Sequence, residues 1–150
     1  GIQRETAYAG ILKTSPDIGM YTSVETGDCS IRNAFAANDA VSFGSIINAY
    51  TQPFLLLYNH RKDRGYAMEA FAKAIRQSGA KPVCIGVIGE HKKACARYMQ
   101  RTTGIRAQAV ELPKEWIQAQ NVRHVLCAGN IKGEGRQFLE EMIEEARQNV

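Results

Sequence analysis

The sequence predicts an α/β fold with a doubly wound, mostly parallel sheet of about five or six strands. Strand-like and helix-like segments alternate about five times along the 150 residues, with connections of only a few residues. The segments 53–58 and 82–88 are continuous apolar runs, which are typical of strands that a parallel sheet buries on both faces. Each crossover helix returns the chain to the same edge of the sheet, so we expect most strands to run parallel.

The elements follow one another in a regular order. An amphipathic helix over 3–14 is expected to end at Ser15-Pro16-Asp17-Ile18-Gly19, because proline and glycine both stop helices. Residues 20–28 are expected to form a loop or an edge segment. The remaining predicted elements are strands at 29–35, 53–58, 82–88, 105–112 and 122–128, and helices at 40–51, 64–78, 90–102, 114–120 and 133–148.

Composition limits the class of protein. A chain of 150 residues is most simply one domain, and its formal charge of +4 arises from 19 basic and 15 acidic residues without a block of like charges. This argues against a nucleic-acid-binding tail and favours small anionic ligands. The chain has no 18-residue apolar stretch and no signal-peptide pattern at its start, so we expect a soluble, intracellular protein.

The four cysteines are predicted to be free core residues. Cys29, Cys84, Cys95 and Cys127 form no C-x-x-C pair and match no zinc spacing. Three of them lie within or beside apolar strand-like runs, where a free cysteine behaves as a small hydrophobic side chain.

Polar or glycine-rich clusters follow the predicted strands at their carboxyl ends. Open α/β sheets bind ligands at this edge. A single polar cluster would be weak evidence of a site, because loops are generally polar and need glycine to turn. Four such clusters together favour a binding edge. They are Asn33 to Asp39, Asn59 to Arg64, Gly89-Glu90-His91, and Gly129 to Gly135.

Arg61, Asp63 and Arg64 form the sharpest group of candidate residues. Two guanidinium groups on either side of a carboxylate are suited to binding phosphate or carboxylate ligands. Alternatively, the three residues form only a salt-bridged helix start on the surface. The neighbouring His60 could assist them, but a lone histidine in a charged loop is more often merely solvated, and this second alternative is the expectation. Asn38 and Asp39 fit equally well a ligand contact or a simple helix cap.

Several familiar motifs do not occur. The chain has no G-x-x-x-x-G-K-[ST] phosphate loop, and Gly129 to Gly135 is not the G-x-G-x-x-G dinucleotide fingerprint. No second ligand lies at helical spacing from His91 or His124, so no metal site is expected. If the reaction uses ATP, the main phosphate-binding loop must lie outside this chain.

The motifs together resemble a known family. The run Asn33-Ala34-Phe35-Ala36-Ala37-Asn38-Asp39, followed about twenty residues later by Asn59-His60-Arg61-Lys62-Asp63-Arg64, is similar to the N-x-F-A-A-N-D and N-x-R-x-D-R stretches of the ligase subunit of poly-gamma-glutamate synthases (CapB or PgsB type). Gly89-Glu90 resembles its G-E, and Gly129-Asn130-Ile131-Lys132-Gly133 its late G-N-I-x-G turn. The start of the chain is similar to the family's hinge, with Ile18 in place of a usual proline.

This resemblance implies a domain of a larger enzyme. The subunit is itself similar to the Mur ligases, which join an amino acid to a carboxylate through an acyl phosphate. Residues 1–20 would then be a hinge from a preceding ATP-binding domain, and 21–150 a Rossmann-like, substrate-binding C-terminal domain of the Mur ligase type. In the Mur ligases the first motif reads closer to D-Y-A-H-N-P. Ala37 replaces its histidine and Asp39 its proline, so only the role of the matching Asn38, contact with the nucleotide, is implied for this chain.

The resemblance also implies roles for the candidate residues. Arg61 and Arg64 would supply charge to an acyl phosphate or to substrate carboxylates, and Asp63 would orient them or hold the amine. The implied substrate- or nucleotide-binding residues are Asn33, Asn38, Asn59, Glu90, Gly129 and Asn130. ATP and Mg²⁺ would be bound mainly by the central domain, and the isolated domain would be inactive.

The implied partners are glutamate or poly-gamma-glutamate, the central ATP-binding domain of the same enzyme and membrane-bound synthase subunits at the inner face of the cell membrane. A homo-oligomer remains open, and no nucleic-acid partner is expected. Two other classes remain. One is a stand-alone α/β module that binds a phosphorylated or carboxylated metabolite without catalysis. The other is an oxidoreductase-type nucleotide domain, which the missing glycine fingerprint disfavours.

Overall fold

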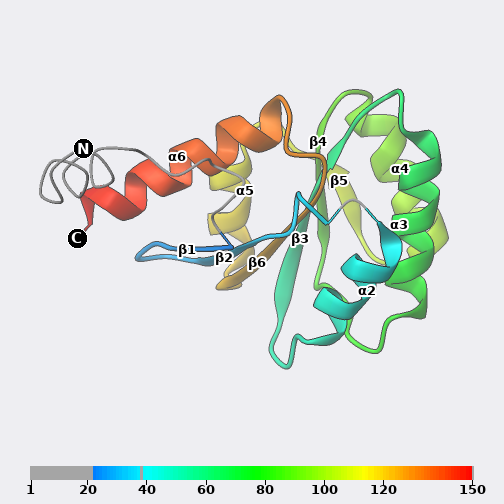
Figure 1. Ribbon diagram of the computed structural model, residues 1–150, viewed down its shortest axis with the longest axis horizontal. Coiled ribbons are helices and arrows are strands. Elements are labelled where there is room, and N and C mark those ends of the chain that lie inside the picture. The colour runs from blue at the N-terminus through cyan, green and yellow to red at the C-terminus, as the bar shows by residue number, and fades with distance from the viewer. Residues whose placement is uncertain (1–21, 38, 150) are drawn as a thin grey trace, which may run out of the picture.

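The computed structural model describes residues 22–37 and 39–149, and Figure 1 gives the element labels used below. The helix expected at 3–14, the hinge expected at 1–20 and Asn38 lie outside the described residues.

A six-stranded sheet lies at the centre of the described part of the chain, in the order β1-β2-β6-β3-β4-β5. β1 pairs antiparallel with β2, and every other neighbouring pair is parallel. The expected mostly parallel sheet is therefore confirmed, and the segment at 20–28 contributes its antiparallel edge strand. The strands are β1 (Ser23–Glu25), β2 (Ser30–Asn33), β3 (Phe54–His60), β4 (Ile85–Gly89), β5 (Ala107–Ala109) and β6 (His124–Gly129).

Helices cover both faces of the sheet. In Figure 1, α2, α3 and α4 lie on one side of the strands, and α5 and α6 lie on the other. Each helix turns an apolar stripe towards the sheet, as Phe71, Ala72 and Ile75 do on α3. The helices are α2 (Ala40–Asn48), α3 (Gly65–Gln77), α4 (Lys92–Thr103), α5 (Pro113–Gln120) and α6 (Glu134–Gln148).

The central strand β3 joins two hydrophobic cores. All seven of its residues are buried, and successive side chains point to opposite faces. Leu55 and Leu57 pack in the core beneath α5 and α6, whereas Leu56 and Tyr58 pack in the core beneath α2, α3 and α4. Burial of each leucine stabilises the fold by roughly 1.5–3 kcal/mol, which explains why this run is continuously apolar.

The chain order places a topological switch at β6. The connections from β2 to β5 run through α2, α3 and α4 on one face, and the chain then returns through α5 on the other face to insert β6 between β2 and β3. Strands whose helices leave towards opposite faces open a crevice at their carboxyl ends. The carboxyl ends of β2, β6 and β3 are thus the expected ligand edge.

Some predicted strand boundaries were wrong. The strand expected at 29–35 ends at Asn33, because a turn closed by the Ala37 N–H and the Ala34 carbonyl (3.0 Å) follows it. The strand expected at 53–58 continues through Asn59 and His60, since both residues still pair with β4.

Two other predicted strands are shorter than expected. β4 begins at Ile85 rather than at 82, and the strand expected over 105–112 has only three residues, at the edge of the sheet. The two residues before β4 already bond to β3, since the Val83 N–H donates to the Phe54 carbonyl at 2.8 Å and the Cys84 carbonyl accepts from the Leu56 N–H at 3.2 Å. All four cysteines are free and buried, which confirms the core position predicted for Cys29, Cys84 and Cys127.

Candidate functional site at the carboxyl edge of the sheet

The predicted polar clusters meet at one edge of the sheet. Asn59, near the end of β3, lies in register with Gly129 of β6 on one side and Ile88 of β4 on the other. Asn33, the last residue of β2, lies in register with Cys127 of β6. The structure therefore brings the four strand ends together, as their order along the chain predicted.

Asn59 ties the end of β3 to the loop after β6. Its side chain is buried, with 2% of its surface exposed. The Asn59 amide nitrogen donates to the main-chain oxygens of Asn130 and Lys132, the latter at 2.8 Å. A Cβ at Gly129 would collide with the Asn59 main-chain oxygen, and one at Gly135 would lie 2.6 Å from the Asn59 amide nitrogen. These glycines let the two loops approach each other around one buried amide.

A second link joins the loop after β4 to the start of α6. Glu134 Oε2 accepts a hydrogen bond from the Gly89 N–H at 2.9 Å, and Glu134 Oε1 lies 3.3 Å from Lys92 Nζ. Lys92 also pairs with Glu111 at 3.0 Å. Burial alone would lower the pKa of Lys92, but its bonds to Glu111 and Glu134 raise the pKa above its usual value. Lys92 is therefore a permanently charged brace at this edge.

The predicted cationic group follows β3 directly. Arg61 Nη2 donates to Asp63 Oδ2 at 2.8 Å, with 26% and 56% of the two side chains exposed. A turn places the Arg64 N–H 3.0 Å from the Arg61 carbonyl. Lys62 Nζ, after β3, lies 3.7 Å from Glu90 Oε2, after β4. Asp63 thus holds one guanidinium in place just beyond the end of β3, and part of the Arg61 side chain is open to solvent.

His60 is buried, so the expectation that it is merely solvated was wrong. Only 6% of its surface is exposed, and Nδ1 has no hydrogen-bond partner among the described residues. Its ring stacks near Tyr58, with 6.3 Å between centroids. Burial, followed by the charge of His91, lowers the pKa of His60, while Glu90 and Asp63 oppose that shift. The imidazole is therefore held in its neutral form near neutral pH.

Helix amino termini surround the same edge. The α2 terminus is capped by Asp39, whose carboxylate accepts from the Ser42 N–H at 2.7 Å. This bond holds the pKa of Asp39 below its usual value, and it confirms the cap expected at 38 or 39. The amino termini of α3, α4 and α6 carry no side-chain cap. Their N–H groups and helix dipoles favour anions at this edge.

The remaining predicted residues shape the loops. Asn33 Oδ1 accepts from the Phe35 N–H at 3.1 Å, and Asn130 Oδ1 accepts from the Lys132 N–H at 2.8 Å. Gly129 has φ +98°, a left-handed conformation that favours glycine. These residues fix the local backbone from which any ligand contact would be made.

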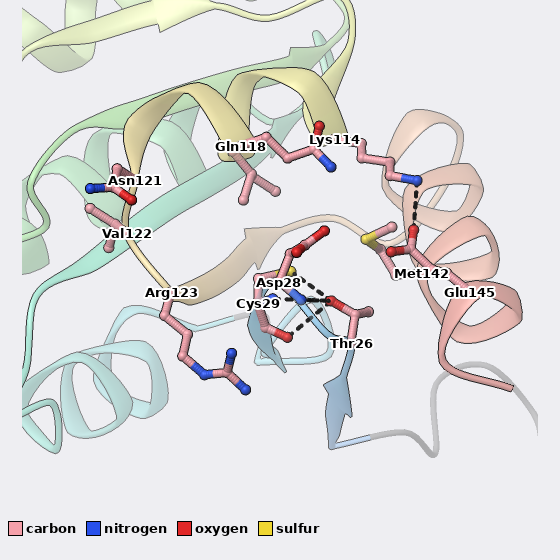
Figure 2. A pocket seen from close by; sticks show the side chains of 11 residues that line it. Thr26, Asp28, Cys29, Lys114, Gln118, Asn121, Val122, Arg123, Met142 and Glu145 are labelled. Carbon is pink, nitrogen blue, oxygen red and sulfur yellow. Dashed lines mark hydrogen bonds and ion pairs between the residues drawn. The ribbon is translucent and has the colours of Figure 1, made fainter. Parts of the chain in front are cut away.

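A cavity of about 360 Å³ lies at the opposite edge of the sheet, where β2 and β6 begin. Lys114 Nζ of α5 lies 2.7 Å from Glu145 Oε2 of α6. Figure 2 shows this ion pair on one side of the cavity, together with the hydrogen bond from the Cys29 N–H to the Thr26 hydroxyl. None of the predicted site residues lines this cavity. Its lining residues are Thr26, Asp28, Cys29, Lys114, Ile117, Gln118, Asn121, Val122, Arg123, Met142 and Glu145.

Two further observations concern metals and membranes. Within residues 22–37 and 39–149, no group of three or more histidine, cysteine, aspartate or glutamate side chains could hold a metal ion. In the same residues, no helix is long and apolar enough to span a bilayer.

Comparison with known proteins identifies the family. Residues 21–145 match the family model of the poly-gamma-glutamate synthase CapB C-terminal domain. The chain belongs to this family. A search of curated protein sequences found no match.

Among solved structures, the CapB-type chain is similar to folylpolyglutamate synthase from Thermotoga maritima, with a TM-score of 0.60 and 15% sequence identity over 98% of this chain. At this identity the likeness shows the fold alone. This chain spans only 36% of the length of that synthase chain.

The comparisons confirm the family resemblance and, through the family, the relation to ligases, and the fold likeness agrees with the predicted doubly wound α/β fold class. Sequence reasoning found most of the polar residues at the edge of this CapB-type domain. It missed the bracing pair Lys92 and Glu134 and the burial of His60. The only sequence signal for the pair was an acidic residue at the predicted start of the last helix.

Proposed function

We propose that this chain is the C-terminal domain of an ATP-dependent ligase that joins glutamate units into poly-gamma-glutamate through an acyl-phosphate intermediate. Family membership supports the relation to ligases. The observation that carries the proposal is a set of groups at the carboxyl edge that would favour an anion. There, the Arg61 guanidinium is held by Asp63 beside three helix amino termini without side-chain caps.

The chemistry needs such an edge. The terminal carboxylate of a glutamate chain would take the γ-phosphoryl group of ATP, giving an acyl phosphate and ADP. The neutral amine of the next glutamate would attack the acyl carbon, and inorganic phosphate would leave as the amine loses a proton. Positive charge around the phosphoryl oxygens and exclusion of water would favour this step. Arg61 and Arg64 would supply that charge, and Asp63 would orient them or hold the incoming ammonium group.

The nucleotide and its metal would be bound mainly by another domain. Mg²⁺ that accompanies a nucleotide is usually held by one or two carboxylates together with phosphates and waters, and among the described residues no group of three or more histidine, cysteine, aspartate or glutamate side chains could hold a metal ion. Asn38 remains our candidate for contact with the nucleotide when the domains close, as lids do elsewhere. Membrane-bound synthase subunits at the inner face of the cell membrane would be the partners of the whole enzyme.

Replacement of Arg61 tests this assignment. In the full-length enzyme, Arg61→Ala should abolish polymer formation while leaving the fold intact, because exposed ion pairs contribute only about 0–1 kcal/mol to stability. Arg123→Ala is a matched control, since Arg123 also pairs with a carboxylate, Glu25 at 3.6 Å, but lies just before β6 at the opposite edge of the sheet. The measurements are glutamate incorporation into polymer and a thermal melt.

The control variant should form polymer at the wild-type rate. Polymer synthesis retained by Arg61→Ala, with an unchanged melt, would contradict the assigned role of Arg61 and weaken the proposed function.

A further inference from the structure

A groove with one basic wall runs between α4 and the edge strand β5, outside the site described above. Its volume is about 290 Å³. β5 is the last strand of the sheet, and no described strand covers its outer side. The groove is lined by Lys93, Ala96, Arg97, Gln100, Ala107, Gln108 and Ala109, so it contains two cations and no carboxylate.

The cations of α4 form one continuous stripe. Lys93, Arg97 and Arg101 recur at a spacing of four residues and are exposed, so they lie on one face of the helix. Within the described residues, none of the three forms an ion pair or a side-chain hydrogen bond. The adjacent Lys92 is different, because it is neutralised by Glu111 and Glu134. The positive charge of the stripe is therefore available to an anionic partner.

The other wall of the groove offers peptide groups. Alternate residues of a strand direct their N–H and C=O groups to opposite neighbours. Ile85 and Val87 of β4 pair with the main chain of Arg106 and Val110, so the peptide groups of Ala107 and Ala109 face away from β4. The Ala107 N–H is bonded to Gln100 Oε1 at 3.0 Å. The peptide groups of Ala109 remain on the open edge, and the short alanine side chains leave room beside them.

We propose that this groove binds an extended amide chain bearing carboxylates, namely the growing poly-gamma-glutamate polymer. Such a chain offers carboxylates to Lys93 and Arg97, and amide groups to the edge at Ala109. The inference rests on the proposed function for the identity of the polymer. Lys93 lies in the first turn of α4, close to the carboxyl edge, and the stripe extends about 12 Å along the helix at ~1.5 Å per residue. The polymer would thus leave the reacting edge along α4.

The groove is less suited to other polyanions. A membrane-binding surface usually presents large apolar side chains beside its cations, and a single-stranded nucleic acid is usually bound with stacking aromatic rings. The exposed large apolar residues of the described chain are Val41, Tyr66, Val83 and Leu112, and none of them lines the groove. The lining contains no aromatic ring.

Binding of labelled polymer tests the groove directly. We would measure fluorescence anisotropy of poly-gamma-glutamate with the full-length protein that carries this chain, at low salt. Lys93→Gln/Arg97→Gln should weaken binding about tenfold, because two charge contacts are lost. Lys73→Gln/Arg76→Gln removes the same charge from exposed positions of α3 and should bind as the wild type does. Equal affinity of the groove variant and the control would overturn the proposal.

Three competing probes test the ligand class. Polyacrylate carries carboxylates without amides, and it should bind more weakly than poly-gamma-glutamate of equal charge. A single-stranded DNA oligonucleotide and phosphatidylserine vesicles should also bind more weakly. Tighter binding of any of the three, with the same sensitivity to Lys93→Gln/Arg97→Gln, would show that the groove serves another class of ligand and would refute the proposal.

A ligation assay separates this inference from the proposed function. If the full-length wild-type enzyme forms no γ-amide bonds, the proposed function fails, and the anisotropy result still decides whether the groove binds the polymer. If ligation occurs, the groove variant should join glutamate to a short acceptor normally but yield shorter polymers. Polymers of wild-type length from the groove variant would contradict the groove alone.

Discussion

Truncation of Asn59 tests the architecture of the carboxyl edge. In Asn59→Ala, the main-chain oxygens of Asn130 and Lys132 both lose the amide donor that the buried side chain provides. Each such hydrogen bond contributes about 0.5–1.5 kcal/mol, and groups left without a partner add a further cost. We therefore expect the free energy of unfolding to fall by about 2–4 kcal/mol.

Denaturant unfolding followed by circular dichroism measures this loss, and Asn130→Ala is the matched control. The Asn130 side chain accepts one local hydrogen bond, from the Lys132 N–H at 2.8 Å near the surface, so its removal should cost only about 0.5–1 kcal/mol. Equal losses for the two variants, or a loss below about 1 kcal/mol for Asn59→Ala, would refute the view that Asn59 clamps the loop.

Three other predictions follow from the same structure. Gly89→Ala should lower the free energy of unfolding by about 3 kcal/mol or more, because Gly89 has φ +92° and an added Cβ would collide with the His60 carbonyl. Gly104→Ala is the control, since Gly104 has φ +74° with open space around it. It should lower the free energy of unfolding by only about 1–2 kcal/mol in the same denaturation assay. Because burial lowers the pKa of His60 in the folded state, the stability due to neutral His60 is present above the unfolded pKa of about 6.5 and lost as pH falls through the folded pKa. Melting temperatures between pH 7.5 and pH 5 should therefore fall further for the wild type than for His60→Gln, and parallel falls would contradict this. The four cysteines are buried, and burial raises the pKa of Cys95 to about 12. A thiol reagent should therefore label the native chain slowly and the unfolded chain at once. Rapid labelling of any cysteine in the native chain would contradict this.

Much of the fold could be predicted because the apolar pattern is strong. The continuous run in β3 is buried on both faces, so it could only be an interior strand. The edge strands were harder to predict. β1 and β5 have three residues each, and their half-exposed side chains leave no clear periodicity for a sequence pattern to show.

The position of the site was predictable, whereas its internal contacts were not. Residues at the carboxyl ends of parallel strands must meet at one edge, which is why Asn33, Asn59 and Gly129 could be grouped from the sequence. The bond between Glu134 and the Gly89 N–H joins residues that are 45 positions apart, and no local pattern encodes it. His60 looked like a loop residue because it stands among charged neighbours. Its burial follows from the extension of β3 by two residues beyond the apolar run.

The nucleotide product of the full-length enzyme tests the central claim most directly. In the proposed reaction, glutamate joins a chain end through an acyl phosphate, so each γ-amide bond formed should release one ADP and one inorganic phosphate. Phosphorus NMR of the reaction mixture, with glutamate incorporation measured in parallel, gives this ratio. We expect equal amounts of ADP, phosphate and new amide bonds in the wild type, and none of them in Arg61→Ala. Release of AMP and pyrophosphate, or amide formation without nucleotide cleavage, would contradict the account.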